Sequence, residues 1–391
     1  MIAFIQPFGL RQVSGGGRIL QSLLQCEHPP VLPIDTSRGH SASEPVPGEI
    51  RVPLRPDFGR VERTRYHAHF GVLDRLGSFR FAANLKKVLR EHRVDAVHLL
   101  HHSYDIVPVT RVVRDLNLPL FLSIHDDFHY TMRGHPFLNQ IERAVGSAWC
   151  DAKSVFVISE EMGHEYARRY GDREFRVVTD GLAQISEAPQ RRPERSLRLY
   201  FMGLFHYSYN ANLRAVLDAM ALIRDRHPDW EISVACRSNS ISCPLINGDV
   251  PVHVLPFASE GEVEKDMLCA DLLYQPLPMA EFAANFAKFS LSTKMITYLG
   301  SGLPILYHGP EDAAAFRLLE RHQAAQLCTT LDPHVIARNL LDALSHRELI
   351  VTNALSLSRS QFMLKDQRRR FWQPFSEAVD LITSGIAERE R

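Results

Sequence analysis

Two polar residues directly follow a strand-like apolar segment and could take part in catalysis. His125 and Asp126 come immediately after the apolar segment Pro119 to Ile124. An imidazole at the end of a strand can bond a hydroxyl group or stabilise developing charge, so we take His125 and Asp126 as candidate catalytic residues. The alternative is that His125 is one of nineteen histidines without a role. The adjacent His101 and His102 end another such segment, and only one of them can face the same side.

A glycine cluster follows the first apolar segment. Gly16 and Gly17 stand in the sequence Ser14-Gly15-Gly16-Gly17-Arg18, before a helical pattern. Bare backbone amides at the start of a helix can hold an anion. The cluster does not match GxGxxG, so a simple turn is the alternative reading.

The segment from Lys288 to Pro304 gives a loop, a helix over 293–300 and a further strand. Ser292 or Thr293 can cap the helix. Its free N–H groups, with Lys288 or Lys294 nearby, would form an anion site suited to a diphosphate. The alternative is an ordinary capped helix with solvated lysines.

Two further candidates lie at predicted strand ends in the second half of the chain. His206 follows the apolar segment 197–202, and Arg237 follows the segment 230–236. Either side chain could reach a phosphate or a base, although a surface arginine is more often only solvated.

The elements that position these residues are parallel βα units. Apolar segments alternate with helical patterns at 2–6, 96–100, 119–124, 154–159 and 176–179, and again from 197 to 308. A polar stretch between Ala183 and Ser196 predicts a linker. We therefore predict an α/β fold with two Rossmann-like doubly wound domains, 1–185 and 197–365, that face a central cleft. A helix over 366–391 is expected to cross back to the first domain.

Composition excludes several classes of protein. Lys plus Arg (45) equals Asp plus Glu (45), so the broad basic field of a nucleic-acid-binding protein is absent. The six cysteines form no CxxC pair, which argues against zinc and against a disulfide framework. The sequence contains neither a leader-like start nor an apolar stretch long enough to span a membrane, so we expect a cytoplasmic protein.

With these residues placed, the chain resembles the retaining GT-B glycosyltransferases of family four over most of its length. The segment STKMITYLGSGLPIL, from Ser292 to Leu306, looks like the family's PSKLFEYLAAGKPVL. Weaker matches occur in the family's order, at Asp95 to His98, Ser123 to Asp126, Val157 to Met162, Val178 to Leu182, and Gly203 with Asn210.

The resemblance implies a two-domain fold and a set of contacts to a nucleotide-diphosphate sugar, with UDP or GDP as the favoured carrier and no metal. His125 would contact the transferred sugar, and the Gly15 to Gly17 loop would close over the phosphates. The amides from Ser290 to Thr293 would bind the diphosphate, and the backbone from Phe257 to Ser259 would bind the base. Two glutamates of the family, eight positions apart, fall at Phe289 and Thr297, and the family's Arg and Lys after the first strand of the second domain are replaced by His206 and uncharged neighbours.

Two other functions stay open alongside glycosyl transfer. A hydrolysing nucleotide-sugar epimerase would share the architecture, and a non-catalytic relative would bind a sugar nucleotide or a partner without turnover. The expected acceptor is a glycan, a lipid-linked glycan or a small molecule, and the oligomeric state stays open. The basic pattern from Phe79 to Arg93 indicates either peripheral contact with the inner face of a membrane or an ordinary core-facing helix with a charged outer face.

Overall fold

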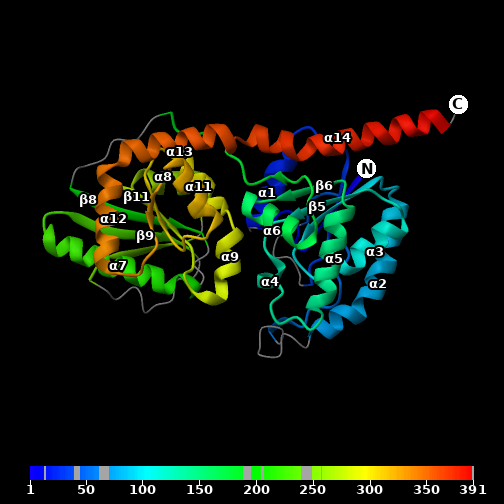
Figure 1. Cartoon of the computed structure of the whole chain (residues 1–391), viewed down its shortest axis with the longest axis horizontal. Coiled ribbons are helices and arrows are strands. Elements are labelled where there is room, and N and C mark those ends of the chain that lie inside the picture. The colour runs from blue at the N-terminus through cyan, green and yellow to red at the C-terminus, as the bar shows by residue number, and fades with distance from the viewer. Residues whose placement is uncertain are drawn as a thin grey trace. The chain divides into compact units, whose positions relative to one another are not determined.

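The structure is a computed structural model that describes the chain except for residues 13–14, 39–44, 61–69, 188–194, 204–206, 239–248, 257 and 390–391. The chain divides into two compact units (Figure 1). Unit 1 consists of Met1–Asp180 with Leu364–Arg391, and unit 2 consists of Gly181–Met363. The predicted domain ends at 185 and 365 lie slightly beyond these boundaries.

The sheet of unit 1 has seven strands in the order β3-β2-β1-β4-β5-β6-β7, and every paired strand is parallel to its neighbour. The strand order reverses between β1 and β4, which is where open sheets of this kind place ligands. The central strands are buried along their whole length, as expected for a sheet covered on both faces. The strands are β1 (Ile2–Gln6), β2 (Val31–Asp35), β3 (Ile50–Arg51), β4 (Ala96–His101), β5 (Leu120–Ile124), β6 (Ser154–Val157) and β7 (Arg176–Val177).

Helices connect the strands of unit 1. Local chemistry fixes some of their ends: Ser159 caps α6 by accepting a bond from the Met162 N–H at 3.2 Å, and Glu160 and Glu161 complement the positive end of its dipole. The helices of this unit are α1 (Gly15–Leu24), α2 (Phe70–Glu91), α3 (Ile106–Asp115), α4 (Phe128–Thr131), α5 (Leu138–Asp151), α6 (Glu160–Tyr170) and α14 (Leu364–Arg389).

The helix α14, drawn in red in Figure 1, belongs to unit 1 although unit 2 precedes it in the chain. Its Phe375 ring stacks on Phe121 of β5 with 4.0 Å between centroids. The Trp372 indole N–H donates to the Leu23 carbonyl at the end of α1, at 2.9 Å. These contacts bury an aromatic face of α14 in the core of unit 1, so the helix completes that core.

Unit 2 repeats the arrangement with a parallel sheet in the order β10-β9-β8-β11-β12-β13, and its strand order reverses between β8 and β11. The strands are β8 (Ser196–Met202), β9 (Glu231–Arg237), β10 (Val252–Leu255), β11 (Leu272–Pro276), β12 (Ile305–His308) and β13 (Gln326–Cys328). Two apolar clusters occupy this unit, one built around α10, α11 and α13 and the other around α7 and α12. The helical elements are η3 (Tyr207–Tyr209), α7 (Asn210–Arg226), α8 (Glu260–Leu268), η5 (Glu281–Ala283), α9 (Ala284–Phe289), α10 (Thr293–Leu299), α11 (Ala314–His322), α12 (Pro333–Ser345) and α13 (Arg347–Gln361).

The prediction of two doubly wound α/β sheets is therefore confirmed, with corrections in detail. Two strands were missed: β2 contains Pro33 and follows two prolines, and β13 is only three residues long. Lys288 lies in the last turn of α9 rather than in a loop, because α9 continues to Phe289. Among the described residues, no helix is both long and apolar enough to cross a bilayer.

Candidate functional site

The catalytic candidate His125 lies at the carboxyl end of β5 in unit 1. The residue is 8% exposed, and among the described residues its Nδ1 has no hydrogen-bond partner. Burial lowers the pKa of His125 to about 4, so the ring is neutral near pH 7. A neutral, buried imidazole with an unused nitrogen can still bond a hydroxyl group.

The glycine cluster lies beside His125. A Cβ atom at Gly16 would stand 3.4 Å from His125 Nδ1 and 3.2 Å from Cζ of Phe8. Glycine therefore allows the first turn of α1 to approach the imidazole closely. The cluster opens a helix as predicted, because α1 begins at Gly15, whereas the loop that the resemblance implies from Gly15 to Gly17 is helical and its Gly17 is buried.

Asp126 is paired with His102, which follows β4. The His102 Nε2 atom lies 3.1 Å from Asp126 Oδ2. Burial opposes charge on both groups, yet their mutual hydrogen bond and attraction raise the pKa of His102 and lower the pKa of Asp126. His101 is fully buried, and burial lowers its pKa to about 3. Of the adjacent histidines, His102 is thus the one that joins the charged cluster.

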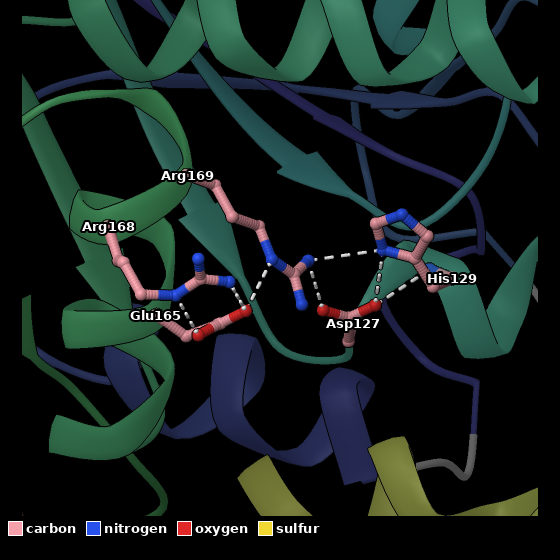
Figure 2. Close-up of polar contacts among 5 residues, drawn as sticks. All are labelled: Asp127, His129, Glu165, Arg168 and Arg169. Atoms are coloured by element: carbon pink, nitrogen blue, oxygen red, sulfur yellow. Dashed lines mark hydrogen bonds and ion pairs between the residues drawn. The ribbon is translucent and has the colours of Figure 1, made fainter.

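Asp127 is held in a network of ion pairs and hydrogen bonds, as Figure 2 shows. Its Oδ2 lies 2.8 Å from Nη1 of Arg169, and its Oδ1 accepts from the His129 backbone N–H at 2.8 Å. Arg169 is held in turn by Glu165, 2.7 Å from its Nε, and Glu165 also pairs with Arg168. The fully buried Asp127 carboxylate therefore fixes the turn after β5 against α6, which leaves His125 and Asp126 as the candidates for chemistry.

Lys294 is the main candidate in unit 2. Its side chain is partly buried in the first turn of α10, with Nζ 4.4 Å from the Phe201 ring centroid and 5.3 Å from that of Tyr209. The structure places it at the carboxyl end of β8, since a Cβ at Gly203 would stand 3.7 Å from Lys294 Cε. Burial lowers the pKa of Lys294 to about 7. Within the part of the chain that the structure describes, its ammonium has no ion pair.

The helix α10 is fixed against the end of β8 by its own polar groups. The Tyr298 hydroxyl accepts from the Met202 N–H at 2.9 Å. Ser292 is the cap of α10, as one of the two predicted alternatives: its hydroxyl accepts from the Met295 N–H at 3.2 Å. Thr297 donates to the Thr293 carbonyl at 3.2 Å. These bonds set the position of Lys294 rather than leaving it on a mobile loop.

Other predicted donor contacts are engaged within the protein. The Arg237 guanidinium bonds Asp266 and donates to the Pro256 carbonyl at 2.6 Å. The Ser259 amide donates to Glu262 Oε2 at 3.2 Å, which fits the capping box of α8. The donor-binding roles of Arg237 and Ser259 stay predictions.

Four further residues were predicted to contact the donor, namely Ser290, Lys288, His206 and Phe257. The Ser290 amide donates to the Phe286 carbonyl at 3.1 Å. Lys288 lies with Nζ 5.4 Å from the Phe289 ring centroid. His206 and Phe257 fall outside the described residues, so nothing is added to those two predictions.

The positions of the family's two glutamates are occupied differently in this fold. Phe289 is 2% exposed and packs in the core. Thr297 bonds within its own helix. Neither side chain can supply the carboxylate that the resemblance expects there.

A buried polar network at the carboxyl ends of β11 and β12 was missed. His308 Nδ1 lies 2.8 Å from the Tyr274 hydroxyl, and its Nε2 lies 2.7 Å from the Thr330 carbonyl. The Asn212 amide donates to the carbonyls of Leu277 and His308 at 3.0 and 3.1 Å. The available signal was a histidine directly at the end of a predicted strand, the same signal that drew attention to His125. In the described residues, no group of three or more His, Cys, Asp or Glu is placed to hold a metal.

Comparison with known proteins fits this architecture. Residues 37–182 match the family model Glycosyltransferase Family 4. Among solved structures, the chain is similar to a trehalose-6-phosphate protein from E. coli bound with UDP-2-fluoro glucose, at 10% identity and a TM-score of 0.63 over 96% of this chain and 98% of that one. It is also similar to MurG from Acinetobacter baumannii, at 15% identity and a TM-score of 0.52 over 92% and 94%.

A third similar structure comes from another enzyme class. It is a putative UDP-N-acetylglucosamine 2-epimerase from Listeria monocytogenes, at 11% identity and a TM-score of 0.57 over 99% of this chain and 96% of that one. A search of curated protein sequences found no match.

The two sheets and these similarities define a protein with the GT-B fold. The resemblance to GT-B glycosyltransferases is confirmed, and the match to Glycosyltransferase Family 4 covers unit 1 from residue 37 to Asp180 and the first two residues of unit 2.

Proposed function

We propose that the protein is a glycosyltransferase that moves a hexose from a nucleoside diphosphate sugar to an acceptor hydroxyl, with retention of anomeric configuration. The observation that carries the proposal is Lys294. This cation lies at the carboxyl end of β8, beside the reversal of strand order in unit 2. A parallel sheet places its ligands at that point.

The surroundings of Lys294 favour the binding of an anion. Partial burial between the Phe201 and Tyr209 rings costs the ammonium its hydration, and no described carboxylate compensates it. A diphosphate would supply the missing negative charge and restore the charged state of the lysine. A UDP sugar is the first donor to test, because the similar E. coli structure is bound with UDP-2-fluoro glucose.

Within unit 1, His125 and Asp126 are the candidates for polar contacts with the sugar. In the proposed step the acceptor oxygen forms a bond to the anomeric carbon, the bond from that carbon to the phosphate oxygen breaks, and the acceptor proton leaves with the departing diphosphate. His125 is neutral and has an unused nitrogen, so it would bond a sugar hydroxyl without becoming a nucleophile. Asp126 lies beside it, with Oδ2 3.1 Å from His102 Nε2, and raises the pKa of His102 against the effect of burial.

The test is calorimetric titration of the purified protein with UDP, GDP, ADP, TDP and CMP. We expect micromolar to millimolar binding of one of the diphosphates and at least a tenfold loss in Lys294→Ala, since one charge-assisted contact contributes about 1.5 to 3 kcal/mol. Lys265→Ala, at an exposed position on α8, is the matched control and should bind like the wild type. Absence of binding by every diphosphate, or equal binding by both variants, contradicts the donor site.

A non-catalytic sugar-nucleotide binder is the second candidate, and the buried Phe289 favours it because a phenylalanine stands where the family has a glutamate. The two functions separate by product analysis with the bound sugar nucleotide and a panel of glycan, lipid-linked and small-molecule acceptors. A new glycoside together with the free diphosphate supports transfer. Binding without any product supports the binder, and a changed sugar epimer would instead support epimerase chemistry.

A further inference from the structure

The exposed face of α2 in unit 1 carries an apolar stripe. Val72, Leu76 and Phe79 are 46%, 64% and 68% exposed, and Phe79 is the most exposed large apolar side chain among the described residues. Their spacings of four and three residues place them on one side of the helix, and the exposed Ala83 continues the stripe. The opposite side, with Phe81 and Leu85, is buried in the unit. The side chains of the stripe therefore do not contribute to the core of unit 1.

Cations border this stripe. Arg75 and Arg80 are exposed on its two sides, and Lys87 and Arg90 are exposed toward the end of the helix. Long basic side chains beside an apolar stripe can bury their carbon stems while the charges stay at the level of phosphate groups. The arrangement fits a surface that is apolar inside and negatively charged at its edge.

The acidic residues of α2 do not cancel these charges. Asp74 is buried, 2.7 Å from Arg55 Nε and 2.9 Å from Arg38 Nη2. Glu91 lies 3.7 Å from Lys87. Arg80 and Arg90 have no ion pair with any residue that the structure describes, so the face is net positive.

We propose that α2 docks unit 1 on a membrane surface that contains anionic lipid, with Leu76 and Phe79 inserted among the acyl chains and Arg75 and Arg80 at the phosphates. A second copy of the chain fits this face less well, because a two-fold contact through α2 would bring like charges together. The proposal goes beyond the proposed transfer reaction, since it concerns where the enzyme acts rather than what it transfers. It also favours a lipid-linked acceptor among the three acceptor classes.

The experiment is sedimentation of the full chain with sucrose-loaded vesicles of phosphatidylcholine, either alone or with 30% phosphatidylglycerol. Binding should require the anionic lipid and weaken when salt rises from about 0.1 to 0.5 M, because screening shortens the reach of the charges. Leu76→Gln with Phe79→Gln, and separately Arg75→Glu with Arg80→Glu, should each lower the bound fraction at least tenfold.

Matched controls are Leu349→Gln on α13 and Arg338→Glu on α12, both at exposed positions of unit 2. They should bind like the wild type. Since all four changed residues of α2 are on the surface, melting curves of the variants should match the wild type and exclude misfolding. Equal binding to neutral vesicles, no effect of the α2 variants, or a dimer that the Phe79→Gln variant abolishes would each overturn the proposal.

Discussion

His102 and Asp126 form a charged pair that joins the ends of two neighbouring strands. The distance from His102 Nε2 to Asp126 Oδ2 is 3.1 Å, and the two residues follow β4 and β5. Asp126 overcomes the effect of burial and raises the pKa of His102, and His102 lowers the pKa of Asp126. Each partner thus favours the charged form of the other, beside His125, whose pKa burial lowers to about 4.

This pair predicts a pH window of stability. The raised pKa of His102 contributes stability that is complete below its ordinary value of 6.5 and is lost as the pH rises through the folded value. The lowered pKa of Asp126 contributes above 3.8 and is lost on acidification. Asp126→Asn should therefore cost about 1 kcal/mol between about pH 4 and 6.5, and less above that range.

Urea denaturation of the wild type and Asp126→Asn at half-unit steps from pH 4 to 9 measures this difference. His102→Gln should give the same pH profile, because it removes the other half of the pair. A stability difference that does not change with pH would mean that the pair is not charged in the folded protein.

The network around Asp127 predicts a much larger effect on stability. Asp127→Ala should lower the free energy of unfolding by about 3 kcal/mol, because Arg169 would keep only Glu165 of its two carboxylate partners and the His129 N–H would lose its acceptor. The matched variant Arg168→Ala removes an exposed cation of the same network and should leave the melting temperature unchanged. Melting curves of the two variants at pH 7 measure the difference. Equal melting temperatures of Asp127→Ala and Arg168→Ala would show that the buried Asp127–Arg169 pair contributes no more than the exposed pair of Arg168.

The sequence was sufficient for most of the alternation of strands and helices, and it limited the cap of α10 to Ser292 or Thr293. Periodicity and capping are local, so they can be read from neighbouring residues. The pairing of His102 with Asp126, and the environment of Lys294, could not be read in this way, because each joins segments that are distant in the chain. Sequence ranked Arg237 with Lys294 as a phosphate ligand, whereas the fold gives Arg237 a carboxylate partner, Asp266.

The approach of α1 to His125 predicts that a β-branched side chain at Gly16 displaces Phe8 or His125. Gly16→Val would place methyl groups against Phe8 and His125, since even a Cβ atom would lie 3.2 to 3.4 Å from them. We expect transfer activity to fall at least tenfold while nucleoside diphosphate binding, assigned to unit 2, stays within twofold. Gly261→Val, at a position where a Cβ meets no atom within 4 Å, is the control, and equal activity of both variants would remove Gly16 from the site.

Replacing Lys294 by a neutral residue should raise the stability of the protein and lower its affinity for a diphosphate. Its pKa falls from the ordinary 10.5 to about 7 in the folded protein, so the unfolded state holds more protons between these values and wild-type stability rises with pH across that range. Lys294→Met should therefore raise the free energy of unfolding, by about 1 kcal/mol at pH 7 or below and by less near pH 10, because it removes a poorly solvated charge. The same variant should lose diphosphate binding.

In the wild type, diphosphate binding should weaken as the pH rises above 7 and Lys294 becomes neutral, whereas Lys294→Arg should bind with little dependence on pH between 7 and 9. Calorimetric titrations of the three proteins across this range measure both effects, and identical pH profiles for wild type and Lys294→Arg would show that the lysine does not meet the phosphates.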